Sequence, residues 1–178
     1  MVLFNDMLML DVTGPMDVFS ISNRLLPEDQ HYRLLTVAEH QTLVRSSCGL
    51  KVQADMTLQD LPAGTDLLLV PGGPGAYGVG HPGLTAWLPK AVKGARRFGA
   101  ICTGAFLLGD AGLLDGYRCT THWNYVERLA QREGREPPRW ELEIDEDAVP
   151  TGKRVGNRRL KRVLGVQLRH PVHLPPEA

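Results

Sequence analysis

The sequence predicts a doubly wound α/β fold, a mostly parallel sheet with helices on both faces, and three observations lead to that prediction. Apolar runs of strand length alternate with segments of helical length along most of the chain. The run DLLLV at 66–70 is apolar throughout, which is typical of a strand buried in a parallel sheet. It ends abruptly in PGGPG at 71–75, a turn signal.

The first elements are predicted from an apolar run and a Gly-Pro pair. The near-continuous run Val2–Leu10 predicts the first strand. Gly14-Pro15 predicts the start of the first helix, because proline fits a first turn, and Asp17 would then complement the helix dipole. The remaining elements follow in chain order: a strand at 32–38, a hairpin at 44–54 turning through 47–49, a strand at 66–70, a helix at 83–93, a strand at 97–101, a helix at 103–111, a turn at 112–116, a strand at 117–121 and a helix at 123–132.

Composition is typical of one soluble domain. The chain has 178 residues, of which 43% are hydrophobic and 22% charged. No apolar run reaches the roughly 18 residues of a membrane span, and no secretory signal is present, so we expect a cytoplasmic protein. Its three cysteines, Cys48, Cys102 and Cys119, include no C-x-x-C pair, which disfavours a disulfide framework and a zinc site.

Charge divides the chain into two parts. Residues 1–150 hold 13 basic and 19 acidic residues, whereas 151–178 hold seven basic residues and only Glu177 as an acidic one. The basic end lacks stacking aromatics and any DNA-binding motif, so direct nucleic-acid binding by this chain is not predicted. We expect an α/β domain at 1–148 and a basic, proline-containing, divergent tail at 149–178.

The most informative position is a cysteine between a predicted strand and a predicted helix. A residue at such a sharp turn is pushed out of the sheet, and the amides and dipole of the following helix favour a thiolate. Cys102 is therefore a candidate nucleophile. The alternative is a small buried cysteine in a tight packing corner, since free cysteine is among the most buried residue types.

Polar or glycine-rich features follow four of the predicted strands. They are Asp11, the glycines of 71–73, Cys102 with Thr103, and His122. Ligands of open parallel sheets bind at the carboxyl ends of the strands, so these residues are expected to share one crevice. The alternative is that turns at strand ends simply favour Gly, Asp and His.

Five motifs occur in order along the chain: LDVTGPMDVF at 10–19, VPGGPG at 70–75, AICTGAFLL at 100–108, AGLLDG at 111–116 and TTHW at 120–123. Together they resemble the ThiJ/PfpI superfamily, which has the flavodoxin-like fold of the class I glutamine amidotransferases. Within it, the Cys-Thr-Gly and Thr-Thr-His-Trp segments resemble isonitrile hydratases and the N-terminal ligand-sensing domains of AraC-type transcription regulators. The resemblance covers about residues 2–147.

Departures from other branches narrow what the resemblance implies. Protease-like members follow the cysteine with histidine, whereas this chain has Thr103, which disfavours proteolysis. No pattern after His122 resembles the His and Glu pair of the amidotransferases. If the chain acts as an isonitrile hydratase, Cys102 would attack the terminal isonitrile carbon. Asp11 would move a proton and activate water, and the product would be an N-substituted formamide.

The same resemblance suggests supporting roles. Thr103 would orient the substrate or the water, and backbone amides near Gly72, Gly73 and Thr103 would stabilise negative charge. Trp123 would line the pocket. Two roles stay open for His122: a strand-end histidine held by a backbone carbonyl, or a histidine beside the cysteine.

The competing implication is ligand sensing without turnover. The segments at 45–50, 71–77 and 102–108 resemble the AraC-linked domains more than the stand-alone hydratases. We therefore expect a small-molecule-sensing domain without its helix-turn-helix part, with a small-molecule ligand, a second copy in a homodimer, and neither cofactor nor metal.

The resemblance fails at the C-terminal end. Both groups continue after 145–148 with a strand and an Ala-Gly-Ile-Asp helix, whereas this chain continues VPTGKR and ends rich in proline. We expect residues from about 149 onward to be out-of-frame or divergent sequence, and the chain to be a truncated regulator. The first strand is also several residues shorter than the fold would use.

Overall fold

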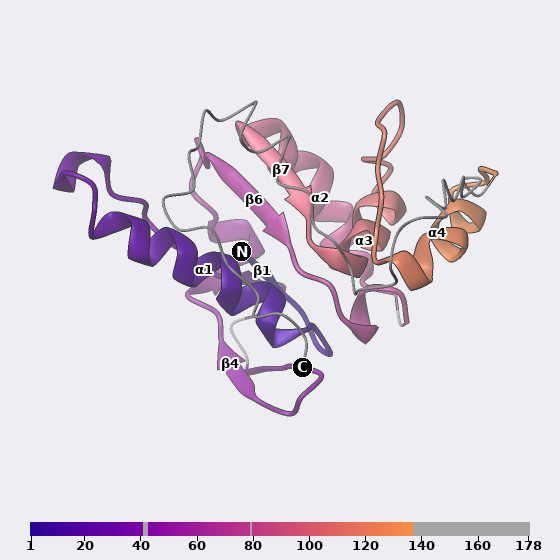
Figure 1. The fold of residues 1–178 in the computed structure, drawn as a ribbon, viewed down its shortest axis with the longest axis horizontal. Helices are drawn as coiled ribbons and strands as arrows, with labels where there is room; N and C mark the ends of the chain where they lie inside the picture. Colours follow the sequence, from indigo (N-terminus) through magenta and orange to yellow (C-terminus); the bar gives the residue numbers. More distant parts are fainter. Residues whose placement is uncertain (41–42, 79, 137–178) are drawn as a thin grey trace, which may run out of the picture. The chain divides into compact units, whose positions relative to one another are not determined.

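Parallel strands form the centre of the computed structural model, which describes residues 1–40, 43–78 and 80–136 (Figure 1). These residues belong to one compact unit, Met1–Arg139. The predicted tail at 149–178 and the predicted boundary before it lie outside the described residues.

The parallel strands are β1 (Val2–Leu3), β2 (Val37–Ala38), β5 (Met56–Thr57), β6 (Leu67–Val70) and β7 (Arg97–Ala100). β2 pairs with β1 on one side and with β5 on the other, and β6 pairs with β7. β1 also contacts β6 and lies beside it in Figure 1, so the strands follow the order β5-β2-β1-β6-β7. The C-terminal ends of β1, β6 and β7 are therefore neighbours.

Helices alternate with these strands. They are α1 (Met9–Asn23), α2 (Pro82–Gly94), α3 (Ala105–Asp110) and α4 (Val126–Arg132), with the short 3-10 turns η1 (Glu28–Gln30), η2 (Leu58–Asp60), η3 (Pro74–Ala76), η4 (Cys102–Gly104) and η5 (Trp123–Tyr125). α1 follows β1, α2 follows β6, and η4 with α3 follows β7. This succession confirms the predicted doubly wound α/β class.

The core consists of apolar side chains from the central strands and the helices packed on them. Val2 and Val37, opposite each other in the β1–β2 ladder, are fully buried, and so is Phe106 of α3. Removing such side chains from water is the main favourable contribution to folding. Further buried apolar residues are Leu3, Phe4, Met7, Leu58, Leu68, Val70, Leu84, Leu88 and Leu107.

The first strand is much shorter than the predicted run Val2–Leu10. It ends at Leu3, and the chain turns away from the sheet at Asp6. Asp6 has a φ of 59°, in the left-handed region that aspartate tolerates better than most residues. The polar pair Asn5-Asp6 thus divides the apolar run into a strand and the approach to a helix.

Helix α1 begins at Met9, five residues before the predicted start at Gly14. Asp11 therefore occupies its first turn, and Pro15 lies inside the helix. The predictions of a helix start at Gly14-Pro15 and of Asp17 in the first turn are wrong. The reason is the turn at 5–6, which ends the first strand early. The apolar residues after the turn therefore lie outside the strand, and the helix begins among them.

The predicted hairpin is confirmed. β3 (Leu43–Arg45) and β4 (Lys51–Gln53) pair antiparallel, and Gly49 at the tip has a φ of 90° that favours glycine. The amide of Asp6 donates a hydrogen bond of 2.7 Å to the carbonyl of Arg45, which ties the hairpin to the turn after β1.

Residues 117–121 form no strand, contrary to the prediction. Residues 117–120 are exposed, and no described strand lies beside them to complete a ladder. A strand without a neighbour leaves its backbone groups unpaired. The apolar residues of this segment are therefore not enough to make it a strand. β2 is likewise shorter than the predicted strand at 32–38, whereas the predicted strands at 66–70 and 97–101 and the predicted helices at 83–93 and 103–111 agree closely with the structure.

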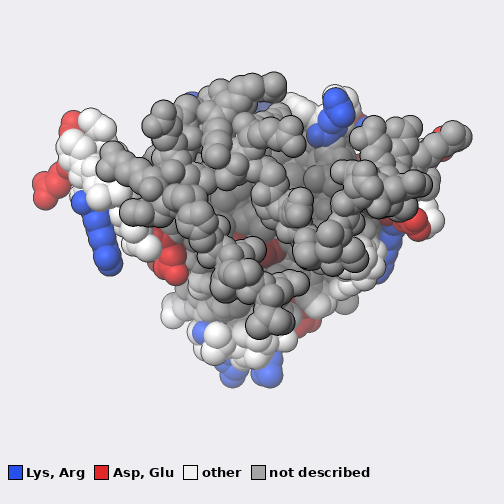
Figure 2. Space-filling model, in the orientation of Figure 1, with Lys and Arg blue, Asp and Glu red and all other residues white. Residues whose placement is uncertain are grey.

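Basic and acidic side chains of the described residues are visible at several separate places in Figure 2. Arg132 of α4 pairs with Asp110 of α3 at 2.7 Å, which joins the two helices. No described helix is long and apolar enough to cross a lipid bilayer.

Candidate functional site

Cys102 occupies a strained turn between β7 and η4. Its φ of 53° lies in the left-handed region, which costs a residue with a Cβ about 1–2 kcal/mol. The amide of Ile101 still donates to the carbonyl of Val70 at 2.9 Å, so the β6–β7 pairing continues up to the turn. Cys102 itself is partly exposed. The predicted sharp strand-to-helix turn is therefore present, and it presents the cysteine at the sheet edge.

The carboxylate of Asp11 lies beside this turn. Oδ2 of Asp11 accepts a hydrogen bond of 2.9 Å from the amide of Gly72. A Cβ built on Gly72 would lie 2.8 Å from that oxygen, 2.8 Å from the amide nitrogen of Thr103 and 2.9 Å from Cβ of Cys102. Three segments far apart in the sequence thus meet at Gly72, and only glycine fits between them. Asp11 reaches the cysteine turn from the first turn of a helix, and not from a strand end.

The hydroxyl of Thr103 holds the glycine loop in place. Thr103 is 3% exposed, and its Oγ1 accepts from the amide of Gly73 at 2.9 Å and donates to the carbonyl of Gly73 at 3.2 Å. Gly73 has a φ of 128°, a conformation that side-chain-bearing residues rarely adopt. Because the amides of Gly72 and Gly73 are both engaged, a ligand would have to compete with Asp11 and Thr103 for these donors.

The segment containing His122 is fastened to the cysteine turn through its neighbour. The hydroxyl of Thr121 donates to the carbonyl of Cys102 at 2.9 Å. Nδ1 of His122 accepts a hydrogen bond of 3.2 Å from the amide of Asn124, so the ring caps η5. The ring also stacks on Trp123, with centroids 5.5 Å apart, and Trp123 is 62% exposed. No described hydrogen bond joins His122 to the cysteine.

Two tyrosines that the sequence argument did not single out as site residues lie at the same edge. The hydroxyls of Tyr77 and Tyr125 are 2.8 Å apart, and the Tyr77 ring packs on Phe106 at 5.9 Å. The hydrogen bond with Tyr125 is the main reason that the pKa of the Tyr77 phenol is raised; burial raises it further, Arg128 lowers it, and Cys102 makes the smallest contribution. Tyr77 closely follows the glycine turn and Tyr125 closely follows the TTHW motif, a proximity that could have identified both.

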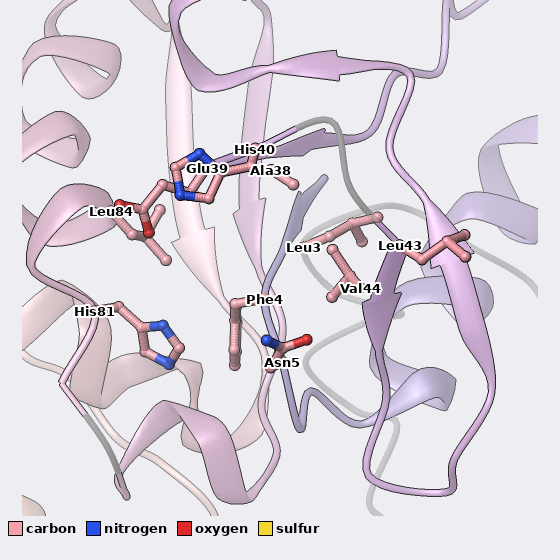
Figure 3. Close-up of a pocket in the computed structure, with 10 residues that line it drawn as sticks. All are labelled: Leu3, Phe4, Asn5, Ala38, Glu39, His40, Leu43, Val44, His81 and Leu84. Carbon is pink, nitrogen blue, oxygen red and sulfur yellow. The ribbon is translucent and has the colours of Figure 1, made fainter.

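A separate pocket of about 100 Å³ lies among β1, β2, β3 and the start of α2 (Figure 3). Its walls combine apolar side chains with Glu39, His40 and His81, and none of the predicted site residues lines it. Nε2 of His81 donates to the carbonyl of Gly75 at 3.0 Å.

Within the described part of the chain, no group of three or more His, Cys, Asp or Glu residues is arranged to hold a metal ion.

Comparison with known proteins gives an uncharacterized relative, an enzyme and a transcription regulator. An uncharacterized protein in the cpoL 5′ region of Streptomyces lividans is 44% identical over 131 residues, which cover 72% of this chain and 89% of that protein. Isonitrile hydratase of Pseudomonas putida is 37% identical over 128 residues, covering 71% of this chain and 53% of the enzyme. The HTH-type transcriptional regulator GbdR of Pseudomonas aeruginosa is 30% identical over 129 residues, covering 72% of this chain and 35% of the regulator.

Solved structures agree with this result. The crystal structure of an AraC family transcriptional regulator from Pseudomonas putida matches with a TM-score of 0.61 and 27% identity, covering 76% of this chain and 71% of that one. Both groups that the sequence motifs resemble are thus among the relatives, although this chain spans only about half of the hydratase and a third of GbdR. The family model named DJ-1/PfpI matches residues 1–156, and the chain therefore belongs to the DJ-1/PfpI family.

Proposed function

We propose that this chain is a small-molecule-sensing domain of the kind found in AraC-type regulators, and that its ligand binds against Cys102. The observation that carries the proposal is the meeting of Asp11, Gly72, Cys102 and Thr103 at one partly exposed point of the sheet edge. The similarity to GbdR and to the AraC family structure supports the regulator-type assignment.

The hydrogen bonding favours sensing over catalysis. A catalyst needs preorganised donors aimed at the charge that develops in the transition state. Here the amide of Gly72 donates to Asp11, and the amide of Gly73 donates to Thr103. Both amide donors are thus occupied by the protein itself when no ligand is bound. Occupied donors suit a rigid recognition surface better than a site that stabilises an oxyanion.

Cysteine protection tests the proposal. Trypsin places the three cysteines in separate peptides, 46–51, 98–118 and 119–128, so alkylation of each can be measured alone. A metabolite that raises the melting temperature should protect the 98–118 peptide from iodoacetamide, while the exposed cysteines of the other two peptides stay reactive. The metabolite should be recovered unchanged. Protection of all three peptides, or of none, would contradict the proposal.

The second candidate function is isonitrile hydration, favoured by the carboxylate beside the cysteine and by the similarity to isonitrile hydratase. The Cys102 sulfur would form a bond to the isonitrile carbon while that carbon gains a proton. Water would then add to the carbon and displace the sulfur, so that R–N≡C and H₂O give R–NH–CHO. Cyclohexyl isonitrile is a suitable probe. N-cyclohexylformamide formed by the wild type and not by Cys102→Ala would establish the enzyme and exclude sensing without turnover.

A homodimer is part of the proposal. α1 is apolar on several sides, and Leu10, Val18 and Ile21 are all more than half exposed, as is Leu25 just beyond its end. A helix with apolar residues all round is normally buried, so a second copy of the chain is the occupant that we propose for this surface.

Two further parts of the proposal rest on the sequence. We propose a domain boundary between 148 and 149, on the change of net charge there. A cytoplasmic location is supported by the free thiols of Cys48, Cys102 and Cys119, which suit a reducing compartment.

A further inference from the structure

The tyrosine pair beside the cysteine turn has a hydrogen-bonding capacity that the site described above does not use. Two phenols whose oxygens are 2.8 Å apart share one proton between them, since one hydroxyl donates and the other accepts. The accepting hydroxyl keeps its own proton for a third group.

The pair is packed against α3, the helix that follows the cysteine turn. The ring centres of Tyr77 and Tyr125 lie 5.9 and 6.5 Å from that of Phe106, in the first turn of α3. Helical side chains point back toward the preceding turn, so this packing directs the tyrosines toward the cysteine end of η4 and α3. The turn η3, which ends one residue before Tyr77, also contacts η4.

Arg128 of α4 holds Tyr77 from another side. Its guanidinium lies 4.8 Å from the centre of the Tyr77 ring and donates a hydrogen bond of 3.0 Å to the Tyr77 carbonyl. No described carboxylate forms an ion pair with Arg128. The ring of Tyr77 is therefore held between Arg128 of α4 and Phe106 of α3, which fixes the place of the tyrosine pair.

We propose that the Tyr77–Tyr125 hydroxyl pair is the polar wall of the Cys102 site and donates a hydrogen bond to an acceptor oxygen, a carbonyl or carboxylate, of the ligand. The inference rests on the proposed function, in which a small molecule binds against Cys102. Tyr77 and Tyr125 are positioning residues in this arrangement, and they select ligands that carry an acceptor oxygen over ligands of similar size that carry none.

Two alkylating probes of different polarity test this selection. In each reaction the Cys102 sulfur forms a bond to a CH₂ carbon, the carbon–halogen bond breaks, halide leaves and the thiol proton goes to solvent. Iodoacetamide has a carbonyl oxygen beside that carbon, and allyl bromide has none. The ratio of the two rates, measured on the 98–118 peptide, cancels any change in the thiolate fraction and reports recognition of the oxygen.

We expect Tyr77→Phe to lower this ratio by about 2- to 10-fold, the range for one hydrogen bond to a neutral acceptor. Tyr125→Phe should lower it too, because the remaining hydroxyl loses its fixed orientation. Tyr117→Phe is the matched control, since Tyr117 is exposed and packs on Phe98, and it should leave the ratio unchanged.

The outcomes separate this inference from the proposed function. An unchanged ratio in Tyr77→Phe, or an equal fall of both rates, would overturn the role of the tyrosine pair, because only packing would then have been disturbed. If neither probe modifies the 98–118 peptide of the wild type, no small molecule reaches Cys102, and the proposed function fails together with the inference.

Discussion

Replacing Gly72 by alanine should destabilise the protein and disturb the cysteine turn at the same time. The added Cβ would lie 2.8 Å from the Asp11 carboxylate oxygen, 2.8 Å from the Thr103 amide nitrogen and 2.9 Å from the Cys102 Cβ, all closer than real Cβ atoms approach. The Thr103 nitrogen is backbone and cannot move away cheaply. Gly72 has an ordinary φ, so the effect isolates crowding from backbone strain.

The size of the effect follows from two contributions. Overpacking costs about 1–3 kcal/mol, and weakening the charged hydrogen bond between the Gly72 amide and Asp11 adds about 1 kcal/mol or more. A loss of about 2–4 kcal/mol in the free energy of unfolding lowers the melting temperature of a chain of this size by roughly 4–16 °C. Urea unfolding followed by far-UV circular dichroism measures the free energy, and iodoacetamide alkylation of the 98–118 peptide measures the cysteine turn.

Gly94→Ala is the matched control, because nothing lies within 4 Å of a Cβ built on Gly94 at the end of α2. Its free energy of unfolding should stay within about 0.5 kcal/mol of the wild type. If Gly72→Ala were equally neutral and left the alkylation rate unchanged, the close approach of the three segments would be refuted.

Three other predictions concern separate parts of the molecule. Thr103→Val removes the hydroxyl that holds the glycine loop and should lower the free energy of unfolding by about 1–3 kcal/mol. Thr103→Ser keeps a hydroxyl and should retain most of the wild-type free energy of unfolding. If Thr103→Val and the wild type had the same urea unfolding curve, this role of the hydroxyl would be contradicted. Ser46→Ala removes the hydrogen bond that chiefly lowers the pKa of Cys48, so the alkylation profile of the 46–51 peptide should move to higher pH, and an unmoved profile would disprove that cause. Val18→Glu on α1 should convert the proposed homodimer to a monomer in sedimentation velocity, whereas Leu50→Glu, at similar exposure on the hairpin, should not; a dimer that survives Val18→Glu would exclude this face as the interface.

The sequence predicted the central elements because their signals are local. The buried run at 66–70 and the glycine turn after it are adjacent in the chain, and so are the strand and helix around Cys102. The convergence of Asp11 with Cys102 was also predicted, although Asp11 lies on a helix and not at a strand end. Because β1 is short, the first turn of α1 begins close to the sheet edge, and the Asp11 carboxylate reaches that edge from the helix.

The errors and omissions arise from interactions between distant segments. The segment at 117–121 has strand-like composition but no neighbouring strand among the described residues, and composition cannot supply a neighbour. The Tyr77–Tyr125 pair joins residues 48 positions apart through one hydrogen bond between side chains, for which no short motif exists. The hydrogen bond from the Gly72 amide to Asp11 is likewise visible only when helix α1 and the glycine loop are placed together.

The crowding around Gly72 also limits how such a site can change. The centre is assembled from backbone, two glycines and one buried threonine, so almost any larger side chain introduced there collides with another chain segment. New ligand preferences would therefore have to arise from residues that surround the centre and still have room to vary, such as Tyr77 and the segment at 121–125. An engineer seeking altered recognition should randomise that surrounding ring and leave the glycine centre untouched.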